Sequence, residues 1–171
     1  MRQPQGNAGA VASPQRGGKF LTFFLAHEEY GIEILKVQEI IGMMSVTPVP
    51  RTPAFVQGVI NLRGKVIPII DLRLKFGMPA MEQTEETCII VVQARGMEMG
   101  IVVDKVSEVL DINGEDIDDV PSFGATVQTA YLLGIGKAAG RVKLLLAIDR
   151  VLSTDEVVEL RVPGLAEMVM A

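Results

Sequence analysis

Short apolar runs, broken every few residues by polar corners or glycine, run through most of the chain. Residues 20–26 (FLTFFLA) are nearly all apolar, and residues 30–34 (YGIEI) alternate apolar with other positions at a period of two. Residues 88–94 (CIIVVQA) and 97–106 (MEMGIVVDKV) are a second apolar pair, and Gly96 between them is typical of a hairpin turn. Runs of this length, bounded by turn residues, predict strands with at least one buried face.

Helical periodicity is confined to short pieces. Residues 72–76 predict a short helix after a strand, and residues 153–160 predict another. In the second piece Ser153 is the expected N-cap, and Glu156 three residues later completes a capping box. Residues 141–148 (RVKLLLAI) predict one more strand. The predicted class is therefore mainly β with short helices.

An internal repeat runs through these strands. Residues 31–41 (GIEILKVQEII) align with residues 100–110 (GIVVDKVSEVL) at an offset of 100 − 31 = 69. In the same order, residues 64–71 align with residues 140–149, a block that is two residues longer. An insertion of even length leaves the inward and outward faces of a strand unchanged. The chain is therefore predicted to contain two similar β lobes.

Small twisted sheets commonly protect their edges by closing into a barrel. Two barrels side by side predict a groove between the lobes, and such a groove is where ligands and partner elements commonly bind.

Composition sets the outer limits of this organisation. The chain has 171 residues, of which 49% are hydrophobic and 22% charged, enough for one globular unit or two small lobes. No apolar run approaches the roughly 18 residues that a membrane span needs. Residues 1–18 lack the apolar core of a signal peptide and predict a disordered tail, so the domain is expected over 19–160, followed by a tail at 161–171. Cys88 is the only cysteine, which excludes an intrachain disulfide and favours the cytoplasm.

The charge distribution argues against a nucleic-acid partner. The formal net charge is −5, and residues 104–119 hold seven acids against Lys105 alone. An acidic surface repels phosphate backbones. The simplest interpretation of this run is a solvated rim that aids solubility.

The residues that usually carry catalysis are scarce. His27, the only histidine, lies in a charged corner, where an exposed turn residue is a better interpretation than a general base. Cys88 opens an apolar strand, where a thiol is usually buried and inert. Residues 134–140 (GIGKAAG) match no phosphate-binding loop and lead into a strand, so they predict a flexible loop. The sequence therefore predicts no catalytic site, no cofactor and no metal site.

A cation stands between two apolar runs in the stretch GVINLRGKVIPIIDLRL, which begins at Gly58. Arg63 and Gly64 fall at the predicted turn, and Asn61, two residues earlier, is expected to share a face with Arg63. The two glycines allow a bulge or a close approach of backbones, and Pro68 favours an edge strand or a bulge. Two interpretations follow: a solvated hairpin arginine, or a polar anchor on the rim of the interlobe groove.

The segments EEYGIEILKVQEI, TPAFVQGVINLRGKVIPIIDLRLKFG, GIVVDKVSEVL and YLLGIGK, in that order, resemble the CheW family of bacterial chemotaxis coupling proteins. The resemblance covers roughly residues 19–160. It implies two five-stranded SH3-like β-barrels and a non-catalytic adaptor of a two-component system. The implied partners are the cytoplasmic tip of methyl-accepting chemoreceptors, which packs in the groove, and the regulatory domain of the histidine kinase CheA. It further implies a cytoplasmic protein that is recruited to receptor arrays through these partners, with no direct membrane insertion.

The resemblance also implies a receptor-binding surface. Carried over position by position, it comprises Val37, Glu39, Gly58, Asn61, Arg63 and Val106. Val37 and Val106 are partners in the internal repeat, so the lobes are expected to offer equivalent apolar contacts. Kinase-binding residues, and the roles of the Pro-rich loop 47–53 and the two tails, stay unassigned. Two alternatives remain: a coupling protein of a receptor array outside chemotaxis, and a small-molecule sensor that uses the groove, although no convergent polar cluster supports the second.

Overall fold

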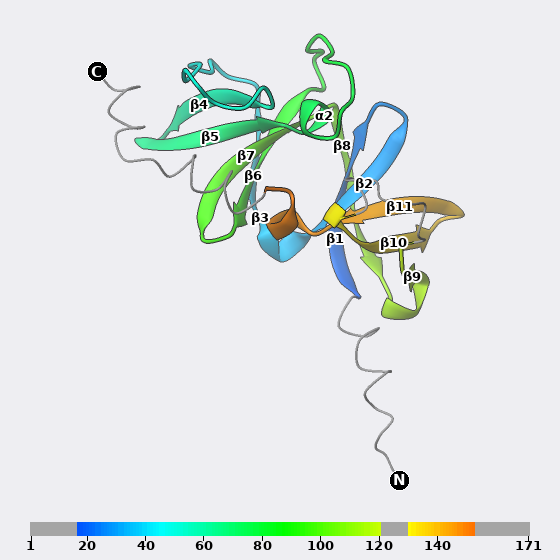
Figure 1. Cartoon of the computed structure of the whole chain (residues 1–171). Helices are drawn as coiled ribbons and strands as arrows, with labels where there is room; N and C mark the ends of the chain where they lie inside the picture. The colour runs from blue at the N-terminus through cyan, green and yellow to red at the C-terminus, as the bar shows by residue number, and fades with distance from the viewer. Residues whose placement is uncertain (1–16, 121–129, 153–171) are drawn as a thin grey trace.

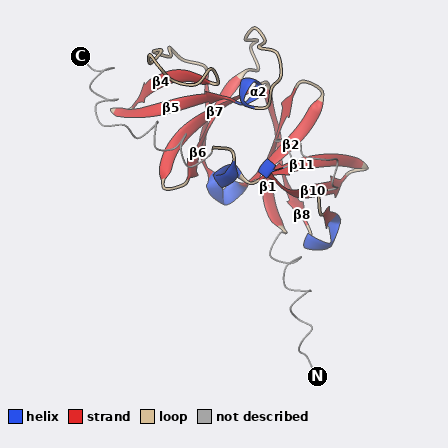
Figure 2. Ribbon diagram, viewed as in Figure 1, coloured by secondary structure: helices blue, strands red, loops and turns tan. Residues whose placement is uncertain are grey.

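Two β-sheets lie side by side and form two lobes, with short helices at the junctions between strands (Figures 1 and 2). The computed structural model describes residues 17–120 and 130–152. The first lobe has the strand order β8-β1-β2-β11-β10-β9, with β1 (Gly18–Leu25), β2 (Glu28–Glu33), β8 (Lys105–Ile112), β9 (Ile117–Asp118), β10 (Leu132–Ala138) and β11 (Arg141–Leu146). The second lobe has the order β3-β6-β7-β5-β4, with β3 (Val37–Gly42), β4 (Val56–Leu62), β5 (Lys65–Asp71), β6 (Cys88–Ala94) and β7 (Met97–Val103). The short helices are η1 (Ile34–Lys36), α2 (Leu72–Lys75), η2 (Gly114–Asp116) and η4 (Ile148–Arg150).

The predicted class is confirmed, and so are the predicted Gly96 hairpin and the short helix after a strand. The hairpin at Gly96 joins β6 to β7, and α2 forms where one helical turn is predicted. Asp71 begins α2 as its N-cap, because its carboxylate accepts a hydrogen bond from the backbone N–H of Leu74 at 3.2 Å. The predicted capping box at Ser153, residues 1–16 of the predicted tail and the tail at 161–171 lie outside the described residues.

The internal repeat takes the form of an exchange of strands. The units β1-β2-β3 and β6-β7-β8 each place two strands in one lobe and the third strand in the other. Val37 of β3 lies opposite Val92 of β6, and Val106 of β8 lies opposite Phe23 of β1. The two valines are 106 − 37 = 69 residues apart, and the residues opposite them are also 92 − 23 = 69 apart. A bulge interrupts each pairing at the equivalent place. Each lobe is therefore completed by a strand of the other unit, which interlocks the two.

The second part of the repeat runs without an insertion. Ile69 of β5 lies opposite Gly100, and Leu145 of β11 lies opposite Gly31, at a constant offset of 145 − 69 = 76. These strands approach closely: a Cβ on Gly31 would lie 3.0 Å from Leu145, and one on Gly100 would lie 2.7 Å from Ile69. The expected two-residue insertion is wrong, because Asp149 lies within η4, beyond the end of the strand, and is not the equivalent of the N-cap Asp71.

The first lobe has one strand more than the expected five. Asp118 of β9 pairs with Ile135 of β10, and in the second lobe Thr47 forms an isolated bridge with Val59 of β4. Ile135 and Val59 are counterparts in the repeat, since they are 135 − 59 = 76 residues apart. The Thr47 and Val59 backbones exchange two hydrogen bonds of 2.9 Å. The sixth strand is thus the counterpart of the Thr47 bridge, and the two contacts add a strand segment beside the equivalent hairpins β10–β11 and β4–β5.

Two predictions about strands are wrong. Most of the predicted flexible loop 134–140 belongs to β10, in which a Cβ on Gly136 would lie only 3.1 Å from Ile112 and 3.2 Å from Leu145, so the glycine serves close packing. Of the two alternatives for Pro68, the edge strand is wrong, since β5 lies between β4 and β7, whereas β4 does bulge opposite the neighbouring Ile69. The parallel pairing of β5 with β7 begins only at Ile69, so Pro68, which has no backbone N–H, is not required to donate a hydrogen bond to β7.

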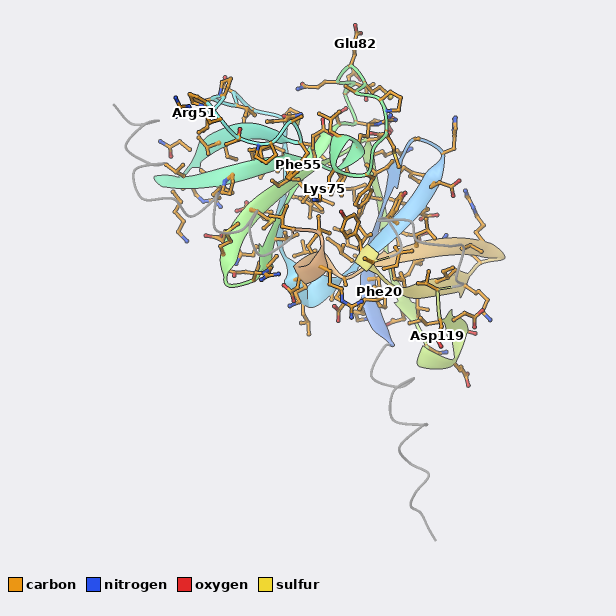
Figure 3. All side chains as sticks on the ribbon, in the orientation of Figure 1. Phe20, Arg51, Phe55, Lys75, Glu82 and Asp119 are labelled. Carbon is orange, nitrogen blue, oxygen red and sulfur yellow. The ribbon has the colours of Figure 1, made fainter. Side chains whose placement is uncertain are left out.

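The largest hydrophobic cluster is shared by both lobes. It draws buried side chains from both sheets and from α2, whereas two smaller clusters lie one within each sheet. Phe76, just after α2, packs between Tyr30 and Tyr131 of the first lobe, with ring centroids 5.8 and 5.4 Å away. Beside it the Lys75 ammonium lies 4.4 Å from the ring of Phe55 (Figure 3). The inner part of the interlobe junction is therefore packed with side chains.

Candidate functional site

The tip of the β4–β5 hairpin presents the arginine that the sequence singles out. Arg63 and Gly64 form a two-residue turn with φ values of +53° and +87°, as a type I′ hairpin turn requires. Asn61 accepts a hydrogen bond from the Gly64 N–H through its side-chain oxygen at 2.8 Å. The expectation that Asn61 and Arg63 share a strand face is wrong, because β4 ends at Leu62 and Arg63 belongs to the turn. Asn61 instead stabilises the turn that carries Arg63.

Arg63 forms an ion pair with Glu39 of β3. The strands β3 and β4 stand at opposite ends of the second lobe's strand order, so this contact spans the seam where the barrel closes. The Arg63 side chain remains 69% exposed, and an exposed pair of this kind contributes little to stability. The ion pair therefore orients a guanidinium that stays accessible to a partner.

Gly58 lies in β4, one of the two strands at this seam, and contacts the backbone of Thr47. Its φ is +143°, and a Cβ at this position would lie 2.1 Å from the Thr47 carbonyl oxygen. Gly58 is buried, and only glycine allows the backbone of residue 47 to lie against β4. The sequence-based expectation of a bulge or close approach at Gly58 is confirmed on both counts, since β4 also changes register there.

The two valines lie at the points where the chain passes between lobes. Val37 is the first residue of β3 after η1, and Val106 is the second residue of β8. Both are partly buried against the shared interlobe cluster. The structure therefore gathers Glu39, Asn61 and Arg63 along the seam of the second lobe and places the valines at the two crossovers.

Asp104 is a structural residue that the sequence analysis assigned to a solvated acidic rim. Its carboxylate accepts hydrogen bonds from the Arg73 Nε at 2.8 Å, from the Arg73 Nη2 at 2.6 Å and from the Ala26 N–H at 2.7 Å. Burial opposes the charge, but these hydrogen bonds hold the pKa of Asp104 below its usual value. The hydrogen bond that Arg73 donates to the Asp104 carboxylate raises the pKa of Arg73. The only sequence signal was an aspartate that interrupts an apolar run.

Asp149 holds a similar position in the first lobe. One carboxylate oxygen accepts from the Lys36 ammonium at 2.9 Å, and the other accepts from the Arg95 N–H at 2.9 Å. Partial burial opposes its ionisation, yet the two hydrogen bonds hold the pKa of Asp149 below its usual value. Sequence analysis missed this residue because its partners lie far away in the chain.

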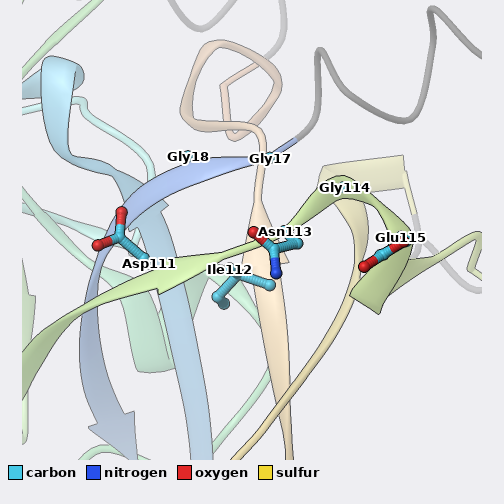
Figure 4. Close-up of a pocket in the computed structure, with 7 residues that line it drawn as sticks. All are labelled: Gly17, Gly18, Asp111, Ile112, Asn113, Gly114 and Glu115. Atoms are coloured by element: carbon cyan, nitrogen blue, oxygen red, sulfur yellow. The ribbon is translucent and has the colours of Figure 1, made fainter.

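The other polar features of the described residues do not assemble a reactive site. His27 is exposed in the turn between β1 and β2, and burial raises the pKa of the half-buried Cys88 thiol. Within 17–120 and 130–152 no three His, Cys, Asp or Glu side chains cluster as metal ligands do. Over the same ranges, no helix has the length and apolarity to cross a membrane. Figure 4 shows an open hollow beside the start of β1, where Asp111 and Glu115 stand apart and do not converge on a common point.

Two interlocked barrels with an exposed, oriented arginine at one seam define a two-lobed β-barrel protein. The chain belongs to the CheW family, because the family model described as CheW-like domain matches residues 19–156. It is 47% identical over 146 residues to chemotaxis protein CheW of Klebsiella aerogenes, covering 85% of this chain and 88% of that one. It is 37% identical over 155 residues to chemotaxis protein CheW of Helicobacter pylori, covering 90% and 93%.

A solved structure agrees with this assignment. The scaffolding protein TtCheW from Thermoanaerobacter tengcongensis matches with a TM-score of 0.75 and 35% identity, over 82% of this chain and 95% of that one. The predicted fold of two SH3-like lobes and the predicted chemotaxis adaptor of the CheW type are confirmed.

Proposed function

We propose that the protein is a non-catalytic adaptor that couples transmembrane chemoreceptors to the histidine kinase CheA. Two findings support this: relatives named as chemotaxis proteins match over most of their length, and a scaffolding protein shares the fold. The observation that carries the proposal is Arg63, which the β4–β5 turn and Glu39 hold accessible at the seam of the second lobe.

The receptor side of the proposal uses the six residues of the expected surface. Arg63 supplies directional donors to carbonyl or carboxylate groups on the tip of the receptor's helical hairpin. Val37 and Val106 supply apolar contacts next to the interlobe cluster. Asn61 and Gly58 shape the hairpin and the seam, and Glu39 orients the arginine.

The kinase side uses a barrel face. The regulatory domain of CheA is expected to pack barrel against barrel on a face away from Arg63. The adaptor works in the cytoplasm and reaches the membrane arrays through its two protein partners.

Reconstitution tests the proposal. The full chain is mixed with CheA and with receptor in membranes, and receptor-stimulated kinase activity is measured. Wild-type protein is expected to raise the activity, while Arg63→Glu fails to do so and still binds the isolated regulatory domain. Absence of stimulation by the wild type, or stoichiometric ATP binding by the adaptor alone in calorimetry, would refute the proposal.

A further inference from the structure

Two three-way junctions hold the lobes together. In the first latch, Arg73 of α2, Asp104 at the β7–β8 crossover and the Ala26 N–H of the β1–β2 turn meet at one carboxylate. Arg73 belongs to the second lobe and Ala26 to the first, while Asp104 lies on the chain between them. This latch therefore ties a hairpin turn of one lobe to a helix of the other through a crossover.

The second latch has the same plan. Asp149 in η4 of the first lobe accepts from Lys36 of η1, at the β2–β3 crossover, and from the Arg95 N–H of the β6–β7 turn in the second lobe. Again a helix of one lobe, a crossover and a hairpin turn of the other lobe share one carboxylate.

The latches are counterparts in the internal repeat, with the charges reversed. The turn residues Ala26 and Arg95 are 95 − 26 = 69 apart and have φ values of +57° and +52°. The helix residues Arg73 and Asp149 are 149 − 73 = 76 apart, so the latches show the same two offsets that relate the strands. In the first latch the crossover supplies the carboxylate and the helix supplies the cation, and in the second latch the roles are exchanged. The crossover residues Lys36 and Asp104 are 104 − 36 = 68 apart, one residue short of the repeat offset, so they occupy neighbouring rather than identical repeat positions. An ion pair of opposite polarity at each junction indicates that the fold favours the junction itself, whichever side carries the charge.

Each latch lies directly before a valine of the proposed receptor surface. Val37 follows Lys36, and Val106 is two residues after Asp104. At these crossovers the chain leaves one sheet for the other, so the latch is the last fixed point before the valine. A shift of the crossover would move the valine relative to the opposite lobe while both sheets stay intact.

We propose that Asp104 and Asp149 are positioning residues of the receptor-contact surface. Through the two latches they set the places of Val106 and Val37 relative to each other, and thereby the shape that the receptor tip meets. This inference rests on the proposed function of that surface. It assigns the two aspartates no contact with the receptor.

The second latch offers the cleaner test of the two. In the first latch, the Arg73 and Asp104 side chains are only 12% and 19% exposed and make a two-point ion pair, so removal of either also destabilises the fold. In the second latch, Lys36 and Asp149 are 36% and 47% exposed, and a pair so accessible to solvent contributes little to stability. Loss of receptor binding without loss of stability is therefore the diagnostic result.

The experiment uses the full chain and the variants Lys36→Met, Asp149→Asn and their combination. Lys36→Arg keeps the charge and serves as the rescue variant. Lys19→Met with Asp111→Asn removes an exposed ion pair of 2.8 Å in the first lobe and serves as the matched control. Each protein is measured for thermal unfolding, affinity for a cytoplasmic receptor fragment and affinity for the kinase regulatory domain.

A fourth measurement reports on the lobes directly. Spin labels at Lys65→Cys and Lys137→Cys, in a Cys88→Ser background, place one probe on the β4–β5 hairpin of the second lobe and one on the β10–β11 hairpin of the first. Electron–electron distance measurements then show whether the lobes keep one relative position or sample several.

We expect Lys36→Met and Asp149→Asn each to weaken receptor binding about five- to tenfold, since a contact site loses affinity when its supporting residues are loosened. The double variant should be little worse than either single one, because both remove the same ion pair. The distance distribution should broaden, while Lys36→Arg, the control pair and kinase-domain affinity stay near wild type.

Three outcomes would overturn the inference. Wild-type receptor affinity with an unchanged distance distribution in the latch variants would show that the latch positions nothing. A joint loss of stability and of both affinities would show a purely structural role. A wild-type protein that does not bind the receptor fragment would refute the proposed function, and the positioning role would fall with it.

Discussion

Arg63 and Ala139 occupy equivalent positions in the two lobes. Each is the first residue of a two-residue hairpin turn, with φ values of +53° and +55°, and each is followed by a glycine. Their separation of 139 − 63 = 76 is the offset that relates the hairpins β4–β5 and β10–β11. The fold therefore demands a left-handed residue at both places but an arginine at neither, so the backbone requirement alone does not account for the cation at Arg63.

Arg63→Ala should separate coupling from stability. The unfolding free energy should change by no more than about 0.5 kcal/mol, as expected for an exposed side chain. Receptor affinity should fall about tenfold or more, since loss of a charged hydrogen-bond donor typically costs roughly 1–3 kcal/mol of binding. Arg63→Glu should be worse, because it also places a negative charge beside Glu39. The measurements are urea unfolding and receptor-stimulated kinase activity on the same protein.

Ala139→Arg is the matched control for this prediction, because it adds an arginine to the equivalent turn of the first lobe. It should leave receptor affinity unchanged. Full stimulation by Arg63→Ala would contradict the role of the arginine, and a large loss of stability would assign it to the fold.

Gly58→Ala should destabilise the protein by about 2–4 kcal/mol, because the new methyl group would meet the Thr47 carbonyl and force a backbone shift. Gly64→Ala provides the comparison, since its φ of +87° is also left-handed but no atom lies within 4 Å of the new methyl group. That change should cost only about 1–2 kcal/mol. Urea denaturation of both variants measures the difference, and equal costs would show that the Thr47 contact does not constrain β4.

The buried ion pair between Lys143 and Glu29 makes a different prediction. The two side chains lie 2.7 Å apart and are 3% and 4% exposed. Lys143→Met should cost about 3–5 kcal/mol, because it leaves Glu29 buried without a counter-charge. The counterpart of Lys143 in the second lobe is the buried Ile67 (143 − 67 = 76), while the counterpart of Glu29 is Glu98 (98 − 29 = 69), which pairs with the exposed Lys65 instead.

The double variant Glu29→Leu with Lys143→Ile should therefore lie within about 1 kcal/mol of wild type or be more stable. Chemical denaturation of the two single variants and the double variant completes the cycle. A double variant as unstable as Lys143→Met would show that the pair itself stabilises the first lobe.

Acid should weaken the two latches. The hydrogen bonds to Asp104 and Asp149 outweigh the effect of burial and hold both pKa values below the ordinary value for aspartate. When folding lowers the pKa of a carboxyl group, the ionised group stabilises the folded protein at pH values above the unfolded-state pKa of about 3.9. This contribution is lost as the pH falls through the folded-state pKa. The unfolding free energy should thus decline from about pH 5 downward. In Asp104→Asn with Asp149→Asn the decline should be shallower, and an unchanged pH slope in urea titrations would contradict the assignment.

Strand positions and the hairpin at Gly96 could be predicted because they depend on local information. Period-two alternation and turn glycines act over a few residues, and the repeat offset of 69 can be found by aligning the chain with itself. The strand β10 was missed because Gly134 and Gly136 imitate a loop, while the small size of Gly136 is required by Leu145 and Ile112 on neighbouring strands. Nothing within β10 itself reports on those neighbours.

The sequence by itself determined the β class, the two-fold repeat and the exposed turn at Arg63. Only the tertiary structure decided that β3 and β8 exchange lobes, since the same local pattern is compatible with pairing inside or outside its own unit. The same holds for Asp104, which looks like any other acid in its run until Arg73 and Ala26 converge on it. These features depend on pairing between distant segments, and backbone hydrogen bonding and burial select that pairing only when the whole chain has closed around a shared core.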